Sequence, residues 1–343
     1  MYNNQKVHNI KDIAKLAGVS HTTVSRVINN SSIVTPDTRK KIMSLIEKTG
    51  YTPNIVAKGL ISGKTYNIGL LVMYNINQYP SDYLLPALLE GMAPIFNMHN
   101  YSLTLIFNES YGYKNNISIK HINRNRMDAL LILLLENSLE LTKSLLEIDL
   151  PKIYINIKPE NTISNFVIAN EYEGAVSAVE HLIKEGHTKI GFIGGTPNVT
   201  SSIDRKMGYV AALERNGIIY SPYNENVGYY NIDKGYEAMK VLLNKNPKLT
   251  AVFLANDLMA MGAIKAIKEN GMKVPDDIAI VGYDNQEFAK YMEPSLTTVK
   301  KPRTLMGQFA AEKIIDSIKT KSSIVEGIVL PTELIIRESS KKK

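Results

Sequence analysis

The chain has 343 residues, of which 44% are hydrophobic and 21% charged, so we expect a globular protein of two or three domains. It contains no cysteine, which excludes disulfides and thiolate metal sites, and its polar first nine residues lack the apolar core of a secretory signal. The longest strongly apolar run, residues 129–135, covers about a third of the ~20 residues that a membrane-spanning helix requires. We therefore expect a cytoplasmic protein without a membrane partner.

The net charge of +7 is distributed unevenly along the chain. Residues 1–66 contain ten Lys or Arg against three acidic residues, so the rest of the chain is neutral overall. A basic end on a neutral body is typical of a nucleic-acid-binding head, because cations that neutralise phosphates release condensed counterions. A merely solvated basic tail would give the same count, so the side-chain pattern has to decide.

The N-terminal segment predicts two helices joined by a tight turn. Apolar residues recur at helical spacing in the first one, at Ile10, Ile13, Ala14 and Ala17, and Gly18 then supplies the backbone freedom of the turn. Ser20 is placed to cap the second helix, since its hydroxyl can accept a hydrogen bond from a free amide of the first turn. Val24, Val27 and Ile28 form an apolar stripe that can pack on the first helix. The pattern is that of a helix-turn-helix.

The other face of the second helix carries short hydrogen-bonding side chains and one arginine: His21, Thr22, Ser25, Arg26 and Asn29. Such a face suits the major groove of DNA, where side chains approach closely and match donors with acceptors. An ordinary surface helix would carry Lys and Glu, and neither occurs between Leu16 and Arg39. We therefore predict that this helix contacts bases.

A third helix is predicted from Thr35-Pro36-Asp37, with a capping Thr, a Pro at the first helical position and an acid near the positive end of the dipole. Its apolar positions Ile42, Leu45 and Ile46 would complete a small core, and Gly50 would end it. Thr52-Pro53 then begins a short helix that reaches about Leu60. Helices below ~12 residues are marginal in water, and the interior Gly59 costs about 1 kcal/mol, so we expect this helix to fold only when docked.

After Lys64, apolar runs alternate with helical stretches. The predicted strands are NIGLLVM, YSLTLIF, ALLILLL and KIYINI, followed by a second set of NFVIA, KIGFIGG, NVGYY, TAVFLA and IAIVGYD. The predicted helices lie at 84–98, near 114–124, near 138–147, at 171–186, near 202–216, at 233–244 and at 257–270. This alternation predicts an α/β body of two doubly wound parallel-sheet lobes of similar size.

Ligands of such sheets bind beyond the carboxyl ends of the strands, here in the cleft between the lobes. Polar residues follow three different strands and could converge there: Arg205, Asn256 and Asp284. Asp257 is interpreted as a helix cap. Planar bidentate groups match adjacent hydroxyls, and a tyrosine can cover the apolar face of a sugar ring, for which Tyr83 and Tyr230 are the candidates. Each of these residues could instead be a cap, a surface charge or ordinary packing.

Three other kinds of protein could use a body of this type. An exported sugar-binding protein would begin with a signal peptide, and a nicotinamide dehydrogenase would need G-x-G-x-x-G, whereas "GFIGGT" has the wrong spacing. A nucleoside-type hydrolase would need a carboxylate cluster, a metal site or an activated nucleophile. The six histidines are scattered, and His181 and His187 are interpreted as surface or packing residues. We expect no enzyme, no catalytic residue, no metal and no cofactor.

The segment "IKDIAKLAGVSHTTVSRVINN", followed by "YTPNIVAKGL", resembles the DNA-binding head and hinge of the lactose-repressor (LacI/GalR) family of bacterial transcription factors. The resemblance implies that His21, Thr22 and Arg26 contact bases and that Leu60 wedges into the minor groove and kinks the operator. Ala57 and Lys58 would line that groove, where the family often has Arg in place of Lys58. The full set of implied DNA contacts is Ser20, His21, Thr22, Ser25, Arg26, Asn29, Asn54, Ala57, Lys58 and Leu60. Leu60 could also be a plain packing residue between hinge helices.

The body is similar to the same family over nearly the whole chain, in "GAVSAVEHLIKEGHTKIGFIGG", "DRKMGYVAALERNGI", "AVFLANDLMAMGAIKAIKENGMKVPDDIAIVGYDN", "PSLTTVKKP" and "PTELIIRES". The resemblance implies periplasmic-binding-protein-like lobes joined by three crossing strands. It also implies effector contacts by Arg205, Asn256 and Asp284, with Tyr83, Tyr230 and Lys301 as further candidates.

Three departures from the family pattern concern the ligand site. Ala169-Asn170 replaces the usual Asp-Asn, Lys301 replaces the usual Gln, and "YPSDYLLP" lacks the common Asn-Pro-Phe-Phe although Tyr83 keeps an aromatic there. Lys301 is either a solvated surface lysine or a positive charge at the cleft rim. In the second case an anionic effector, such as a sugar phosphate or a sugar acid, becomes a candidate.

The sequence thus predicts a homodimeric transcriptional regulator, and more specifically a repressor. It would bind a pseudopalindromic double-stranded operator under the control of a small, carbohydrate-like effector. Residues 1–52 are predicted as the DNA-binding domain, 53–65 as hinge helix and linker, 66–338 as the effector-binding and dimerisation domain, and 339–343 as a basic tail. The N-lobe is predicted to comprise about 66–164 and 300–326, and the C-lobe about 165–299 and 327–338. No leucine heptads follow Arg337, so we expect a dimer rather than a tetramer.

Overall fold

The computed structural model describes residues 9–28, 31–51, 63–73, 83–107, 122–136, 139–159, 164–320 and 326–341, except for the side chains of 139–141. Backbone contacts divide the chain into two compact units, Met1–Tyr66 and Asn67–Lys343. In the described part of the chain, none of the helices combines the length and the apolar character that crossing a membrane requires.

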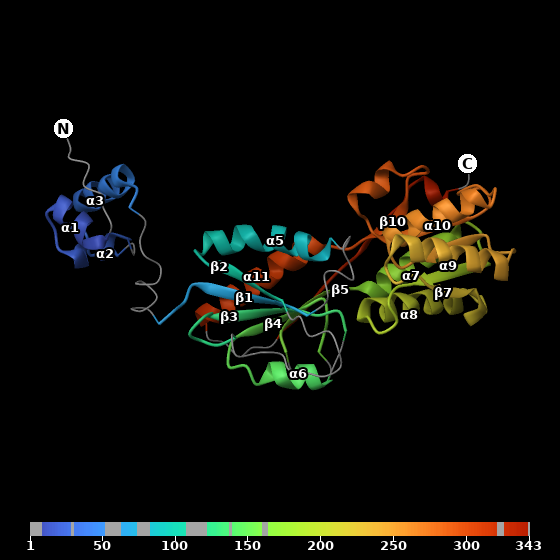
Figure 1. Cartoon of the computed structure of the whole chain (residues 1–343), viewed down its shortest axis with the longest axis horizontal. Helices are drawn as coiled ribbons and strands as arrows, with labels where there is room; N and C mark the ends of the chain where they lie inside the picture. The colour runs from blue at the N-terminus through green and yellow to red at the C-terminus, as the bar shows by residue number, and fades with distance from the viewer. Residues whose placement is uncertain are drawn as a thin grey trace. The chain divides into compact units, whose positions relative to one another are not determined.

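The N-terminal unit contains α1 (Ile10–Ala17), α2 (His21–Ile28) and α3 (Pro36–Thr49) (Figure 1). Its core consists of the apolar positions expected from the sequence, among them Ile13, Val24, Val27 and Ile42. Gly18 follows α1 in the left-handed conformation with φ 69°, which turns the chain tightly enough for α2 to pack on α1. The Ser20 hydroxyl accepts a hydrogen bond from the backbone N–H of Thr23 at 3.1 Å, so the predicted cap is present.

The start of α3 differs from the prediction in one detail. Thr35 precedes the helix, and Pro36 and Asp37 lie in its first turn, but the Thr35 hydroxyl caps no backbone amide. It donates instead to the hydroxyl of Thr38 at 2.9 Å, so the capping role is wrong because a neighbouring side chain satisfies the group. The predicted hinge helix lies outside the described residues, and so do Asn29, Asn54, Ala57, Lys58 and Leu60.

The first sheet of the body is entirely parallel, in the order β11-β5-β4-β3-β1-β2. Its strands are β1 (Asn67–Val72), β2 (Ser102–Phe107), β3 (Ala129–Leu133), β4 (Lys152–Ile155), β5 (Phe166–Ala169) and β11 (Gly327–Leu330). Helices α5 (Leu84–Met98) and α11 (Arg303–Thr320) cover one face, and α6 (Leu139–Leu146) lies on the other (Figure 1). Because both faces are covered, the strands are nearly continuous apolar runs. The helix predicted near 114–124 falls mainly outside the described residues.

The second sheet has the order β12-β10-β9-β8-β6-β7, with only β12 antiparallel to its neighbour. Its strands are β6 (Ile190–Gly194), β7 (Glu225–Val227), β8 (Ala251–Leu254), β9 (Ala279–Asp284), β10 (Thr297–Lys300) and β12 (Glu333–Ile335). Helix α7 (Glu171–Lys184) packs with α8 (Thr200–Arg215), and α9 (Ile232–Lys245) packs with α10 (Asp257–Glu269). Short 3-10 turns are η3 (Pro222–Asn224), η4 (Glu287–Tyr291) and η5 (Glu338–Ser340).

The chain passes between the two sheets three times, after β5, after β10 and after β11. The approximate lobe boundaries predicted near 164 and 326 lie a few residues too early, because β5 and β11 pair with each other and β5 with β4 in the first sheet. Their apolar sequences fit either sheet, and only long-range pairing selects one. The first lobe therefore extends through Ala169 and Leu330.

The predicted basic tail also begins too early. The side chains of Ser339 and Ser340 are fully buried in the second lobe. Ser339 Oγ accepts a hydrogen bond from the Thr297 amide at 2.8 Å and donates to the Ile280 carbonyl at 2.7 Å. The Ser340 hydroxyl lies 2.7 Å from Nε2 of His181, which is buried. Of the two interpretations of His181, surface or packing residue, the second is therefore correct. These contacts tie the C-terminal segment to strands β9 and β10.

Candidate ligand cavity and DNA-facing helix

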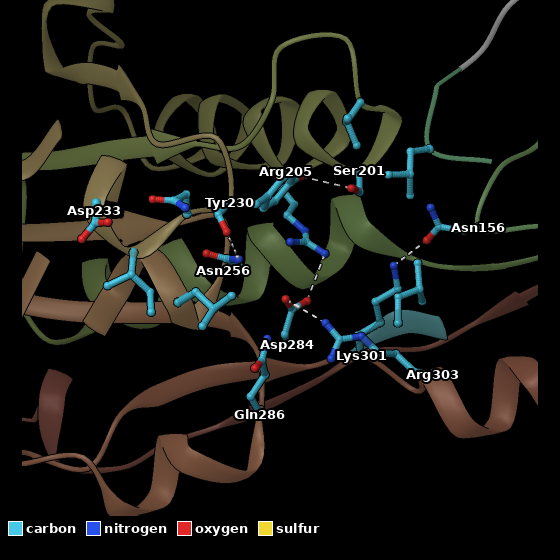
Figure 2. A pocket seen from close by; sticks show the side chains of 16 residues that line it. Asn156, Ser201, Arg205, Tyr230, Asp233, Asn256, Asp284, Gln286, Lys301 and Arg303 are labelled. Carbon is cyan, nitrogen blue, oxygen red and sulfur yellow. Dashed lines mark hydrogen bonds and ion pairs between the residues drawn. The ribbon is translucent and has the colours of Figure 1, made fainter. Parts of the chain in front are cut away.

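A cavity of about 230 Å³ is lined by residues of both lobes (Figure 2). The first lobe contributes Leu84 at the start of α5, Leu135 after β3 and Asn156 after β4. The second lobe contributes side chains from α8 and from the ends of β8 and β9. Parallel strands of one sheet end at a common edge, so the cavity lies where ligands of doubly wound sheets bind.

Arg205 is the central cation of the cavity wall and is only 2% exposed. Its guanidinium pairs with Glu171 Oε2 through Nε at 2.9 Å and Nη2 at 2.8 Å, and Nη2 lies 3.4 Å from Asp284 Oδ1. Nη1 donates to the Ala255 carbonyl, and the guanidinium lies over the Tyr283 ring at 3.7 Å. Arg205 lies more than one turn inside α8, which begins at Thr200, close to the predicted start near residue 202.

Glu171 joins two cations and is itself 6% exposed. Besides Arg205, it pairs through Oε1 with Lys301 Nζ at 2.7 Å, and Lys301 Nζ also donates to Asn156 Oδ1 at 2.6 Å. Burial alone would raise the pKa of Glu171, but the charges of Arg205 and Lys301 outweigh it and lower the pKa to about 2. Lys301 is 7% exposed, so the interpretation as a solvated surface lysine is wrong. It lies in the cavity wall and links the two lobes.

Asp284 is the second shared carboxylate. Its Oδ2 lies 2.8 Å from Arg303 Nη2 in addition to the contact of Oδ1 with Arg205, as Figure 2 shows. Arg303 begins α11 of the first lobe, so this ion pair also joins the lobes. Asp284 has a φ of 109° and Asn285 a φ of 49°, in the region that residues with a side chain rarely adopt. Backbone strain of this kind concentrates at ligand sites.

Asn256, not Asp257, caps α10. The Asn256 Oδ1 accepts a hydrogen bond from the Met259 amide at 2.9 Å, while its Nδ2 donates to the Tyr230 carbonyl at 3.3 Å. Asn256 nevertheless lines the cavity, as predicted. The cap interpretation of Asp257 is wrong because α10 begins at Asp257 itself, one residue later than the cap position.

Asp257 is fully buried beneath the cavity. Its carboxyl accepts hydrogen bonds from the Gln286 amide at 2.7 Å and from the Thr298 hydroxyl at 2.5 Å. Burial first and the neighbouring Asp284 second raise the pKa of Asp257 to about 8, against the opposing effect of those hydrogen bonds. Asp257 is therefore mostly protonated at neutral pH.

The two candidate tyrosines differ in position. Tyr230 lines the cavity, and its hydroxyl lies 3.1 Å from that of Ser201. A Cβ on Gly195 would come within 2.1 Å of the Tyr230 ring, so the last glycine of "GFIGG" leaves room for this ring. Tyr83 precedes α5, is 55% exposed and is not part of the described cavity wall, which its neighbour Leu84 enters instead.

Several residues of the site were not expected from the sequence: Asn156, Glu171, Ser201, Gln286 and Arg303. Glu171 and Arg303 follow the ends of β5 and β10 within a few residues. The same rule that selected Asn256 and Asp284 could therefore have found them. Asn156 and Gln286 also follow strand ends, but amides there are too common to single out. Within the described residues, no cluster of His, Cys, Asp or Glu has an arrangement that could hold a metal ion.

The predicted DNA-facing side of α2 is accessible. His21, Thr22 and Arg26 are exposed and Ser25 is partly exposed, while Val24 and Val27 point into the head core. Ser20 is exposed as well, although its hydroxyl is used to cap α2. The described part of the face thus presents small polar groups and one arginine to solvent.

A helix-turn-helix head and a two-lobed α/β body with an interior polar cavity define the class of ligand-responsive DNA-binding regulators. Residues 9–54 match the model of the lacI family of bacterial regulatory proteins, and residues 179–340 match that of the periplasmic binding protein-like domain. The chain belongs to the lacI family and is a DNA-binding transcriptional repressor, not an enzyme.

Relatives support this assignment over the full length. The probable HTH-type transcriptional repressor ExuR of Bacillus subtilis (strain 168) is 35% identical over 97% of this chain and 98% of its own. The lac repressor dimer bound to operator and the anti-inducer ONPF has a TM-score of 0.83 at 26% identity, covering 98% of this chain and all of that one. The transcriptional regulator CelR in complex with cellobiose has a TM-score of 0.73 at 30% identity, covering 97% and 100%.

Proposed function

We propose that two copies of the chain bind a pseudopalindromic operator, and that a sugar or sugar derivative in the cavity controls the affinity for DNA. The observation that carries the DNA part is the exposed face of α2, which holds His21, Thr22 and Arg26 and contains no Lys or Glu. A bidentate arginine contact to guanine discriminates bases by about 1–3 kcal/mol. Two heads related by a twofold axis would read half-sites about one helical turn apart.

The contribution of the hinge stays a prediction. Asn54, Ala57 and Lys58 are expected to follow the minor groove and Leu60 to insert between base pairs, at the cost of a few kcal/mol for unstacking. This expectation rests on the family resemblance of residues 53–60.

The cavity supports a carbohydrate as ligand. Its wall combines planar hydrogen-bonding groups (Arg205, Asn256, Asp284) with the ring of Tyr230, which suits a molecule with hydroxyls on its edge and apolar faces. Its volume of about 230 Å³ is below the range of roughly 300–1,000 Å³ typical of larger ligands. The similar regulator CelR has been solved with cellobiose. A single sugar ring fits this combination best.

The coupling between ligand and DNA follows from where the cavity lies. Lys301 and Arg303 belong to the segment that crosses from the second lobe to the first, and both reach carboxylates of the second lobe. A ligand that binds among these groups stabilises one relative orientation of the lobes, and with it one population of DNA-competent dimers. A coupling free energy of ~1–3 kcal/mol, about 5- to 150-fold in affinity, is typical and is sufficient.

The experiment begins with selection of bound fragments from the parent genome to define an operator. Gel-shift titrations then compare Arg26→Ala with Lys40→Ala, two exposed cations of the head. We expect Arg26→Ala to lose ~1–3 kcal/mol on the operator and little on scrambled DNA, and Lys40→Ala to weaken both alike through a lost phosphate contact. Equal weakening of both DNAs by Arg26→Ala would refute base contact. A purified protein that shows no salt-dependent attraction to duplex DNA would refute the proposal.

A further inference from the structure

Two side chains of the cavity wall keep a buried polar atom without a partner among the described residues. Arg303 Nε has no acceptor and Gln286 Oε1 has no donor, and both residues line the cavity. The Arg303 side chain is only 10% exposed. Buried polar atoms are normally hydrogen-bonded, because a buried donor or acceptor without a partner is destabilising. The wall therefore offers one free donor and one free acceptor to a ligand.

The charges around these atoms are unbalanced in favour of cations. Arg205, Lys301 and Arg303 line the cavity with side chains that are 3%, 4% and 10% exposed. The buried carboxylates that pair with them are Glu171 and Asp284. Two carboxylates are shared among three cations. At low dielectric such an excess favours an anion in the adjacent space.

The other acidic residues near the cavity do not compensate the excess positive charge next to Lys301 and Arg303. Asp233 lines the cavity but is exposed, and Figure 2 shows it away from Lys301 and Arg303. Asp257 is mostly protonated at neutral pH because burial raises its pKa to about 8. Asp204, next to Arg205 on α8, is partly exposed and is not part of the described cavity wall.

Resting on the ligand function proposed above, we propose that the effector is a sugar acid whose carboxylate binds between Lys301 and Arg303, with a hydroxyl of the same molecule donating to Gln286 Oε1. The Lys301 ammonium, which has three protons, donates one to Asn156 and forms an ion pair with Glu171, so it can also donate to a ligand carboxylate. Arg303 uses Nη2 for Asp284 and keeps Nε. A carboxylate carries one negative charge and matches the single excess cation better than a phosphate group, which carries about −1.5 to −2.

An anion bound at this place would also contact the connection between the two lobes. Lys301 and Arg303 follow β10 directly, in the segment that returns to the first lobe. Both already bind carboxylates that belong to the second lobe. A ligand carboxylate at this place would be held by the connection between the lobes, whereas the sugar hydroxyls would reach Asp284 and Asn256.

The test is calorimetric titration of the full chain with a panel of hexuronic and aldonic acids, among them D-glucuronate, D-galacturonate and D-gluconate. Each acid is paired with an uncharged counterpart of the same skeleton, such as D-glucuronamide, D-glucose or D-galactose. At least one acid should bind about tenfold or more tightly than its counterpart, because a charge-assisted hydrogen bond is lost in the latter. Neutral compounds that bind as well as every acid would overturn the proposal. Tighter binding of D-glucose 6-phosphate than of any acid would overturn the choice of a carboxylate.

Variants separate the ligand contact from a general loss of charge. Lys301→Gln should abolish most of the preference for the acid, whereas Lys300→Gln removes the same charge one residue earlier, at an exposed position, and should keep it. Arg303→Lys retains a cation near Asp284 but removes the Nε donor, so it should weaken the acid and spare the neutral counterpart. Retention of the full preference in both Lys301→Gln and Arg303→Lys would refute the assignment. If no compound of either set binds or changes operator affinity, the proposed sugar function fails instead, and this inference with it.

Discussion

Glu171 offers the sharpest test of the buried charge network. The substitution Glu171→Gln keeps the shape of the side chain and removes the negative charge between Arg205 and Lys301, which pair with it at 2.8 and 2.7 Å. Arg205 would keep Asp284 at 3.4 Å, and Lys301 would keep only the amide oxygen of Asn156. Two buried cations would then lack full compensation.

The magnitude follows from the pKa of the carboxyl. A pKa of about 2, against an ordinary value of 4.5, corresponds to about 3 kcal/mol in favour of the ionised form in the folded protein. Removal of one partner from a buried ion pair typically costs ~3–5 kcal/mol. We therefore expect Glu171→Gln to lower the free energy of unfolding of the body by about 3 kcal/mol at pH 7.

The stabilisation by Glu171 should depend on pH. Because folding lowers the pKa of Glu171, the stabilisation is complete above about pH 4.5 and is lost as the pH falls through about 2. The wild type and Glu171→Gln should therefore differ most at neutral pH and converge in acid.

Urea unfolding followed by circular dichroism measures the effect. Glu173→Gln is the matched control, because Glu173 lies in the same first turn of α7 but is exposed, and its loss should cost less than about 1 kcal/mol. The double variant Glu171→Gln/Lys301→Gln should recover part of the loss, with a coupling of about 1–3 kcal/mol. If Glu171→Gln costs no more than Glu173→Gln, or if the double variant is additive, the network does not stabilise the fold as argued.

Three further predictions concern other parts of the chain. Burial and Asp284 raise the pKa of Asp257 to about 8, so the unfolding free energy should fall as the pH rises from about 5 to 8, by up to ~1.4 kcal/mol per pH unit. Asp257→Asn should remove this slope in urea titrations across that range, and parallel slopes would contradict the argument. Gly91→Ala should destabilise the first lobe by about 1–3 kcal/mol in thermal unfolding, since its Cβ would lie 1.9 Å from the Thr304 carbonyl oxygen of α11; an unchanged melting temperature would count against this packing. Ser20→Ala should cost the head about 1 kcal/mol by removal of the α2 cap, whereas Ser20→Gly should cost only a few tenths, a difference that denaturation of the head can resolve.

Local patterns predicted the three helices of the head and most elements of the body, but not α11, β10, β11 or β12. Gly18 needs a left-handed turn, Ser20 accepts an amide hydrogen bond, and Val24 and Val27 repeat at helical spacing, so each residue carries its own structural reason. The same holds for the buried strands, whose apolar runs reflect helices on both faces of a parallel sheet. Strand ends, in turn, identified Asn256 and Asp284 as part of the cavity wall.

Besides the two helix caps, the assignments that failed depend on how distant parts of the chain pair. Strands β5 and β11 could join either sheet by composition, and their pairing with each other and of β5 with β4 places them in the first. The start of α10 at Asp257 agrees with the prediction, but the cap is Asn256 and not Asp257.

By itself, the sequence determined a basic three-helix head, a neutral body of two wound sheets and the strand ends at which a ligand site would form. These properties depend on periodicity, capping and charge within short segments. Only the tertiary structure decided that Lys301 is buried. Its partners are Asn156 of the first lobe, 145 positions away in sequence, and Glu171 of the second lobe. The sequence around a lysine does not show whether its ammonium is solvated or buried beside a carboxylate. Its charge can contribute to ligand binding only where the fold places it in a cavity wall.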